Sequence, residues 1–129
     1  MNNMQLIIER IDKNNIIVTS TPLRMGILSF LLDELDLINT FKDEIERDID
    51  NLAVPGFTFN STGLKVKDKN TLIVYDLYSE DEEPEKMGFE APRTALWDLL
   101  DEYSKIVNTD WKKITISFDG KKFDLKTEY

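Results

Sequence analysis

The sequence contains no cysteine and no histidine. Without Cys, the chain has no disulfide, no thiolate metal ligand and no cysteine nucleophile, and this composition is typical of a reducing compartment. Without His, it lacks the commonest general base near neutral pH and the commonest protein ligand for zinc. These two absences exclude serine triads, Cys-His dyads, zincin sites and zinc ribbons. Carboxylates, Lys, Tyr or an oxygen-ligated Mg²⁺ or Ca²⁺ remain available for chemistry. No spacing in the sequence organises any of them, so we expect no cofactor and no metal site.

Long apolar runs are also missing. No stretch of about 18 apolar residues occurs, which argues against a membrane-spanning helix. The Met-Asn-Asn-Met-Gln start lacks the basic region and apolar stretch of an export signal, so a cytoplasmic protein is expected. The 129 residues are 41% hydrophobic, enough for one modest core. With no repeat and no Gly/Ser linker, we expect a single domain over residues 1–129.

The net charge of -9 is unevenly distributed. Residues 33–102 contain 7 basic and 19 acidic side chains, whereas residues 1–32 contain three basic and two acidic ones, and residues 103–129 contain six and four. An acidic surface repels nucleic acid and anionic membranes and steers basic proteins towards itself. The expected partner is therefore a basic protein, with no direct binding of nucleic acid or membrane.

Short β-rich runs alternate with turn-forming residues along much of the chain. Strands are expected at residues 4–11 and 16–20, joined by a turn over 12–15, and at residues 57–60, 64–67 and 71–78. The last hairpin turns at Asp119-Gly120, which pairs Ile116 with Phe123. A turn shifted by one residue, to Gly120-Lys121, also keeps one apolar face, so both registers remain open.

Two segments show helical patterns. Residues 24–53 form the first segment. Its early half is too apolar all round for a surface helix and is expected to be buried or bent. Its later half has a core face of Ile38, Phe41, Ile45, Ile49 and Leu52. The second begins near Pro92. Its inward stripe consists of Leu96, Leu99, Leu100, Tyr103, Ile106 and Val107. Together the patterns predict an α+β fold, with an antiparallel sheet built from hairpins and two main helices packed on one face.

Acidic clusters are the main candidates for partner binding. We call one of them the acidic ridge; it follows the side of the first helix opposite its core face and consists of Asp36, Asn39, Asp43, Glu46 and Asp50. A second cluster lies in a predicted loop and contains Glu80, Asp81, Glu82, Glu83 and Glu85. The loop lacks the ligand spacing and central Gly of an EF-hand, so metal binding is not expected. For both clusters the alternative is a solvated surface that serves solubility only.

Two tryptophans complete the set of candidates. Trp97 falls at the edge of the second helix's apolar stripe, where it either anchors a partner or seals the core. Trp111 precedes the last hairpin and is expected in the core. No pair of carboxylates is organised for acid and base work, so the sequence predicts a binding protein rather than an enzyme.

The chain resembles the small immunity proteins that bacteria encode beside polymorphic toxins, including those of contact-dependent growth inhibition. The resemblance loosely spans most of the chain. It rests on overall size, on the helix containing Phe41-Lys42-Asp43-Glu44-Ile45-Glu46, and on the ending Trp111-Lys112-Lys113-Ile114-Thr115-Ile116-Ser117-Phe118-Asp119-Gly120-Lys121-Lys122-Phe123. It implies stoichiometric inhibition of a toxin C-terminal domain, often a nuclease with a basic cleft. The alternatives are a regulatory or accessory subunit of an enzyme, or an acidic mimic of nucleic acid.

Overall fold

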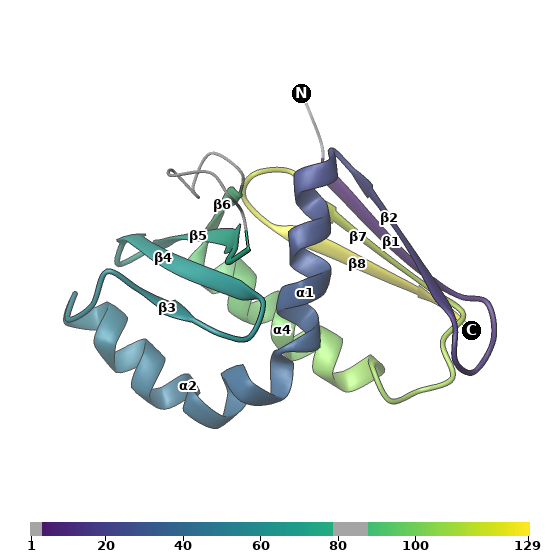
Figure 1. The fold of residues 1–129 in the computed structure, drawn as a ribbon, viewed down its shortest axis with the longest axis horizontal. Coiled ribbons are helices and arrows are strands. Elements are labelled where there is room, and N and C mark those ends of the chain that lie inside the picture. Colours follow the sequence, from purple (N-terminus) through teal and green to yellow (C-terminus); the bar gives the residue numbers. More distant parts are fainter. Residues whose placement is uncertain (1–3, 79–87) are drawn as a thin grey trace.

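A computed structural model describes residues 4–78 and 88–129, which form two four-stranded antiparallel sheets (Figure 1). We call them sheet A and sheet B. Sheet A has the strand order β2-β1-β7-β8. It joins the two ends of the described chain, since β1 pairs with β7. Its strands are β1 (Met4–Arg10), β2 (Ile16–Thr21), β7 (Lys113–Phe118) and β8 (Phe123–Glu128).

Sheet B is built from the middle of the chain in the order β3-β4-β5-β6. Its strands are β3 (Gly56–Thr58), β4 (Thr62–Asp68), β5 (Thr71–Asp76) and β6 (Phe89–Pro92). The strand expected at residues 64–67 begins two residues earlier, because Thr62 and Gly63 belong to β4. Gly63 pairs with Tyr75, whose ring occupies the space that a Cβ at position 63 would need. A larger residue at this point of the strand would require the Tyr75 ring to move aside.

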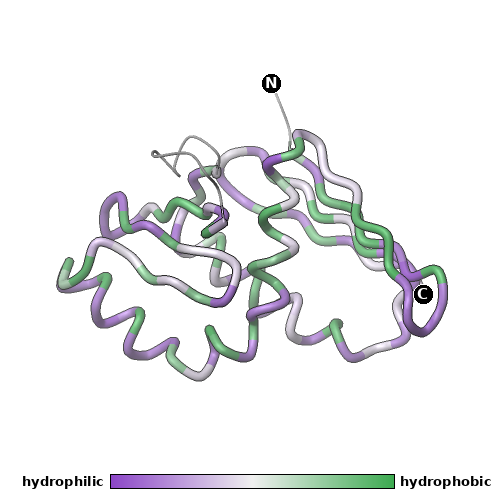
Figure 2. The backbone as a smooth tube through the Cα atoms, viewed as in Figure 1, coloured by the Kyte–Doolittle hydropathy of each residue, from purple (hydrophilic) through white to green (hydrophobic). Residues whose placement is uncertain are grey.

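Three α-helices pack against the sheets within the described ranges. They are α1 (Ile27–Asp33), which follows the short 3-10 helix η1 (Leu23–Gly26), α2 (Leu35–Asp50) and α4 (Arg93–Ile106). Figure 1 shows α1 between the two sheets, with α2 along one side of sheet B. In Figure 2, α1 is mostly hydrophobic whereas α2 alternates between polar and apolar bands. In this part of the chain, no helix is long and apolar enough to cross a membrane.

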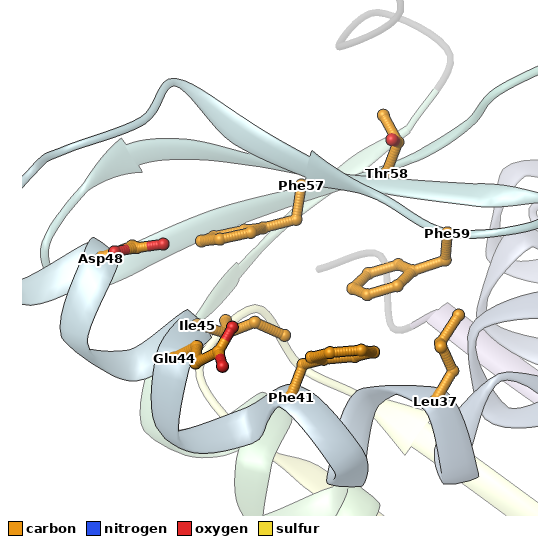
Figure 3. A pocket seen from close by; sticks show the side chains of 8 residues that line it. All are labelled: Leu37, Phe41, Glu44, Ile45, Asp48, Phe57, Thr58 and Phe59. Atoms are coloured by element: carbon orange, nitrogen blue, oxygen red, sulfur yellow. The ribbon is translucent and has the colours of Figure 1, made fainter.

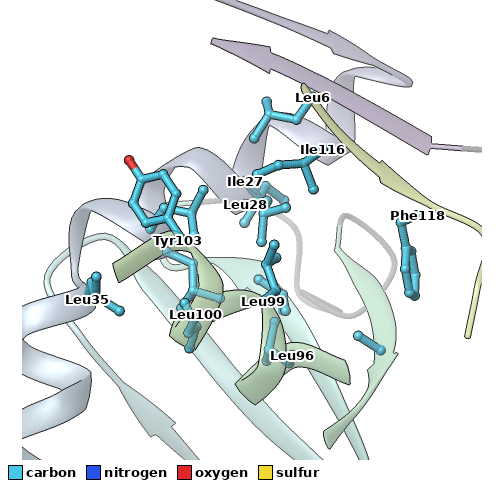
Figure 4. Packing of buried hydrophobic residues seen from close by; sticks show 14 of the residues in the cluster. Leu6, Ile27, Leu28, Leu35, Leu96, Leu99, Leu100, Tyr103, Ile116 and Phe118 are labelled. Carbon is cyan, nitrogen blue, oxygen red and sulfur yellow. The ribbon is translucent and has the colours of Figure 1, made fainter. Parts of the chain in front are cut away.

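The core lies where the two sheets and the helices meet. Alternation along β1 turns Leu6 and Ile8 inward, and β7 contributes Ile116 opposite Leu6. Figure 4 shows Ile27 and Leu28 of α1 between Leu6 and Ile116 of sheet A on one side and Leu99 of α4 on the other. Because buried residues from both sheets and all three helices belong to one cluster, α1 is apolar on almost every side.

The predicted α+β class with antiparallel hairpins is confirmed, although its strands divide between two sheets instead of one. The first hairpin and the inward residues Leu96, Leu99, Leu100 and Tyr103 of the second helix lie as expected. β6, which directly precedes that helix, is not among the expected strands. Its four residues offer too short an alternation to identify from the pattern.

The last hairpin is confirmed in the shifted register. Phe118 pairs with Phe123 and Ile116 with Leu125, which leaves Gly120-Lys121 as the two-residue turn. Gly120 has a positive φ of 96°. The Asp119 carboxylate accepts hydrogen bonds from the backbone N–H groups of Lys121 and Lys122. This Asx-type bonding and the stacking of Phe118 on Phe123, with ring centroids 4.3 Å apart, favour the shifted turn.

Candidate functional site

An apolar groove runs between α2 and β3, one of the two edge strands of sheet B. It has a volume of about 250 Å³. Figure 3 shows Phe57 and Phe59 pointing from the strand side towards α2, and Phe41 pointing back from the helix. We call it the α2–β3 groove. It is lined by Leu37, Phe41, Glu44, Ile45, Asp48, Phe57, Thr58 and Phe59.

Phe41 is the main exposed aromatic residue of the α2–β3 groove. The helical period places it on the core face, but its side chain is 46% exposed, so this prediction is wrong. Sheet B covers the face at Ile38, Ile45 and Ile49, which are buried, and leaves the Phe41 ring at the open side. Leu52, also expected inward, is exposed because α2 ends at Asp50 and the chain turns at Leu52 with a φ of 47°.

Glu34 holds the strand side of the groove in position. It lies buried at the break between α1 and α2, with φ -99° and ψ 15°. Its carboxylate accepts hydrogen bonds from the Ser61 backbone N–H and from the Thr62 hydroxyl, the latter at 2.7 Å. A buried carboxylate is stable only when its oxygens are hydrogen-bonded. These contacts tie the turn after Phe59 to the start of α2, next to the groove.

Two carboxylates, Glu44 and Asp48, border the groove on the solvent side of α2 (Figure 3). They are four residues apart and therefore share one helix face. The helix as a whole contains six acidic and two basic residues. The groove thus combines an aromatic floor with a negatively charged border. Such a site suits an apolar side chain flanked by Lys or Arg.

The structure divides the acidic ridge into two parts. Asp36 and Asp43 are exposed, as expected, and no ion pair among the described residues involves them. Glu46 and Asp50 instead bind Arg93 at the start of α4, with N–O distances of 3.1 and 2.7 Å. Part of the ridge is therefore an internal contact between two helices rather than a free acidic surface.

Arg93 is well held in this contact. Its side chain is largely buried and also donates to the backbone carbonyls of Glu46 and Lys69. The hydrogen bond from Arg93 lowers the pKa of Asp50, and the same bond raises the pKa of Arg93. Both groups therefore remain charged over the whole neutral range. A row of evenly spaced free carboxylates, as an acidic mimic of nucleic acid requires, is interrupted at this point.

A second hollow, of about 210 Å³, lies beside Asp36 and Tyr103. Asp33 also lines it, and burial followed by the nearby charge of Glu34 raises the pKa of this carboxyl. Burial, with the charge of Asp33, likewise raises the pKa of the Tyr103 phenol. In both cases burial makes the charged form of the group less favourable than it is in water.

Trp97 is part of the core edge rather than an exposed anchor. Only 8% of its side chain is exposed, and the Lys42 ammonium lies 6.0 Å from its ring centroid. Its proposed role in partner binding is corrected accordingly: too little of the ring is accessible for it to fill a partner's pocket. Trp111 is buried as expected, donating from Nε1 to the Val107 carbonyl, with the Arg10 guanidinium 4.0 Å from its ring centroid.

The remaining predicted residues, Glu80, Asp81, Glu82, Glu83 and Glu85, lie outside the described residues. Sequence reasoning missed the groove residues Glu44, Asp48, Phe57 and Phe59 as candidates. The alternation of Phe57 and Phe59 two residues apart was the one available signal, because it places both rings on the same side of the strand.

Within residues 4–78 and 88–129, no group of three or more acidic side chains is arranged to hold a metal ion. Comparison of the chain with family models, curated proteins and solved structures finds no match.

Proposed function

We propose that this protein acts by binding another protein through the α2–β3 groove, and that the partner is a basic bacterial toxin domain that it neutralises stoichiometrically. The observation that carries the proposal is the groove itself, in which a half-exposed Phe41 lies beside the carboxylates of Glu44 and Asp48. An immunity role in the cytoplasm is the function that this surface and the family resemblance both support.

The two components of the groove have different effects on binding. Aromatic side chains in a pocket that loses its water provide most of the affinity and slow dissociation. Carboxylates at the border attract a basic partner over a longer range and speed association. A nuclease domain with Lys and Arg around its cleft matches both parts. Its inhibition requires only that the bound chain cover the cleft, so the proposal includes no catalytic step.

The test uses charge reversal on two matched surfaces. One variant replaces Asp43, Glu44 and Asp48 of α2 by Lys. The control replaces three exposed acidic residues of α4 by Lys, namely Asp98, Asp101 and Glu102. The probe is a candidate toxin domain, the C-terminal domain of an exported protein where one is encoded beside this chain's gene. We expect the α2 variant to weaken binding by about 100-fold or more, since several like charges then face a basic surface. The control should bind like the unchanged chain.

Binding is measured by titration calorimetry, and protection by growth of cells that express the domain. The Arg93 contacts of Glu46 and Asp50 are left intact so that α2 stays anchored. The groove is not the interface if both variants lose binding affinity equally, or if the α2 variant still protects cells fully. A domain that forms no complex with the unchanged chain contradicts the immunity role.

A second candidate, an accessory subunit of an enzyme, is favoured by one observation. The edge strand β2 exposes Ile16, Ile17 and Val18, the kind of apolar surface that a permanent partner covers. The two candidates differ in location, because this surface belongs to sheet A and the α2–β3 groove to sheet B. Charge reversal on α2 should leave an accessory role unaffected.

A further inference from the structure

The edge strand β2 lacks the features by which proteins protect sheet edges. It forms the outer strand of sheet A, with β1 on one side only (Figure 1). Ile16 is 57% exposed, Ile17 51% and Val18 42%. All six residues of the strand are uncharged, and none is Pro. An edge of this length and character is a template for pairing with another strand.

The other three edges of the described sheets are protected. β8 contains Asp124, Lys126 and Glu128. β3 has only three residues, and β6 has four, of which one is Glu90 and one is Pro92. Charges, shortness and Pro are standard means of preventing edge pairing. The contrast singles out β2 among the edges that the structure describes.

The register within the first hairpin determines which backbone groups β2 presents. Ile11 donates to the Asn15 carbonyl, and Ile7 and Glu9 lie opposite Thr19 and Ile17. Hydrogen-bonded positions alternate in an antiparallel pair, so the odd residues of β2 bond to β1. The N–H and C=O groups of Ile16, Val18 and Ser20 therefore point away from the sheet.

We propose that β2 pairs in antiparallel fashion with β2 of a second copy of this chain, with Val18 opposite Val18 and Ile16 opposite Ser20 of the second copy. Two identical strands related by a two-fold axis present matching donors and acceptors in this register. Sheet A then becomes one continuous eight-stranded sheet.

The absence of charge on β2 makes this edge a place where two copies of the acidic chain can meet. Each chain has a net charge of -9, so two copies repel unless they meet at an uncharged surface, and β2 is such a surface. Ile16 and Val18 project to the same side of the sheet as the buried Leu6 and Ile8, because they lie opposite Arg10 and Ile8 in the hairpin. Pairing two copies extends that apolar face across the axis and covers side chains that are otherwise exposed.

Sedimentation equilibrium of the full chain tests the proposal. We expect a monomer–dimer equilibrium that strengthens as salt rises, because salt screens the repulsion between the two acidic chains. Val18→Lys should raise the dissociation constant about tenfold or more, since two like charges then meet at the axis. The matched control is Phe41→Lys, at a residue of similar exposure (46% against 42%) in the α2–β3 groove, which should dimerise normally.

A cysteine variant tests the register even if the lysine variant folds poorly. Because the chain has no Cys, Val18→Cys introduces a single thiol. Residues in a hydrogen-bonded antiparallel pair have Cα atoms about 5.5 Å apart, within the range for a disulfide. Under mild oxidation we expect this variant to form linked dimers much faster than Phe41→Cys. A chain that stays monomeric at all concentrations overturns the proposal and leaves β2 to a different protein. Dimers that survive Val18→Lys, or equal linking rates for the two cysteine variants, overturn it as well.

Discussion

Adjacent carboxylates at the end of α1 have opposite surroundings. Glu34 turns inward and binds the turn before β4, whereas Asp33 faces the hollow beside Tyr103. Partial burial makes ionisation of Asp33 unfavourable, and the charge of Glu34 adds to the effect, so the pKa of Asp33 lies above its ordinary value of 3.8. The ionised form of Asp33 therefore opposes folding at neutral pH.

Replacement of this side chain by its neutral isostere tests the effect. A raised folded-state pKa means that the penalty is fully present above that pKa and disappears as the pH falls to about 3.8. Asp33→Asn should thus raise the free energy of unfolding at pH 7, by about 0.5 kcal/mol or less because the side chain is solvent-exposed. Urea denaturation of the variant and the unchanged chain at pH 7 and pH 3.5 measures this difference in the free energy of unfolding. If the variant is more stable by the same amount at pH 3.5, the charge of Asp33 is not the cause.

Phe41 shows how the exposure of an apolar residue depends on its place around the helix. It lies only four residues from Ile45, yet Ile45 is buried and Phe41 is 46% exposed. Leu35 and Ile38, which precede Phe41 in α2, are buried as well, so the covered face does not end before Phe41. At about 100° per residue, Phe41 lies about 60° around the helix from Ile38, at the lateral edge of that face, where it lines the groove.

At the scale of elements, buried polar contacts set how the helices and hairpins are placed. Glu34 joins the α1–α2 break to the turn between β3 and β4, across 27 and 28 residues of sequence. Arg93 joins the start of α4 to the end of α2 across 47 and 43 residues. Between them these contacts anchor both ends of α2, and the first lies next to the α2–β3 groove.

Removal of the Glu34 carboxylate should release the β3–β4 turn. Glu34→Ala leaves the Ser61 N–H and the Thr62 hydroxyl without their acceptor in a buried setting, so we expect a loss of about 2–3 kcal/mol in the free energy of unfolding. Glu44→Ala on the exposed side of α2 is the control and should change stability by less than about 0.5 kcal/mol. Chemical denaturation monitored by tryptophan fluorescence measures both. Equal effects would mean that Glu34 contributes only helix propensity.

For the whole molecule, the net charge of -9 affects the two proposed contacts in opposite ways. A basic partner is attracted to the acidic helix α2, and salt weakens that attraction because the Debye length is only about 10 Å at 0.1 M. Two copies of the chain repel each other, and salt relieves that repulsion. The α2–β3 groove and the β2 edge therefore respond to salt with opposite sign.

Ionic strength can separate the two contacts in one protein. Between about 0.05 and 0.5 M salt, the rate of association with the proposed toxin domain should fall by about tenfold or more, while the proposed dimer of the free chain should become tighter. Stopped-flow fluorescence measures the rate and sedimentation the dimer. An association rate that is independent of salt would remove electrostatic steering from the proposed function.

The sequence alone determined the local elements. The β-rich runs around residues 12–15 predicted the first hairpin, and the Asp119-Gly120 dipeptide predicted the last one, in one of two registers. The spacing of Ile38, Ile45 and Ile49 predicted the buried face of α2. Such features depend on the conformational preferences and side-chain directions of residues close together in the chain, and periodicity reports these directly.

Only the tertiary structure decided how these elements meet. Nothing in the pattern shows that the strands divide into two sheets, that Arg93 engages Glu46 and Asp50, or that Trp97 is covered. Periodicity identifies residues that share a face, but the length and position of the covering element determine whether that face is buried. For the same reason the acidic ridge was predicted from one helix, whereas the α2–β3 groove exists only because β3, more than ten residues beyond Phe41, lies against it.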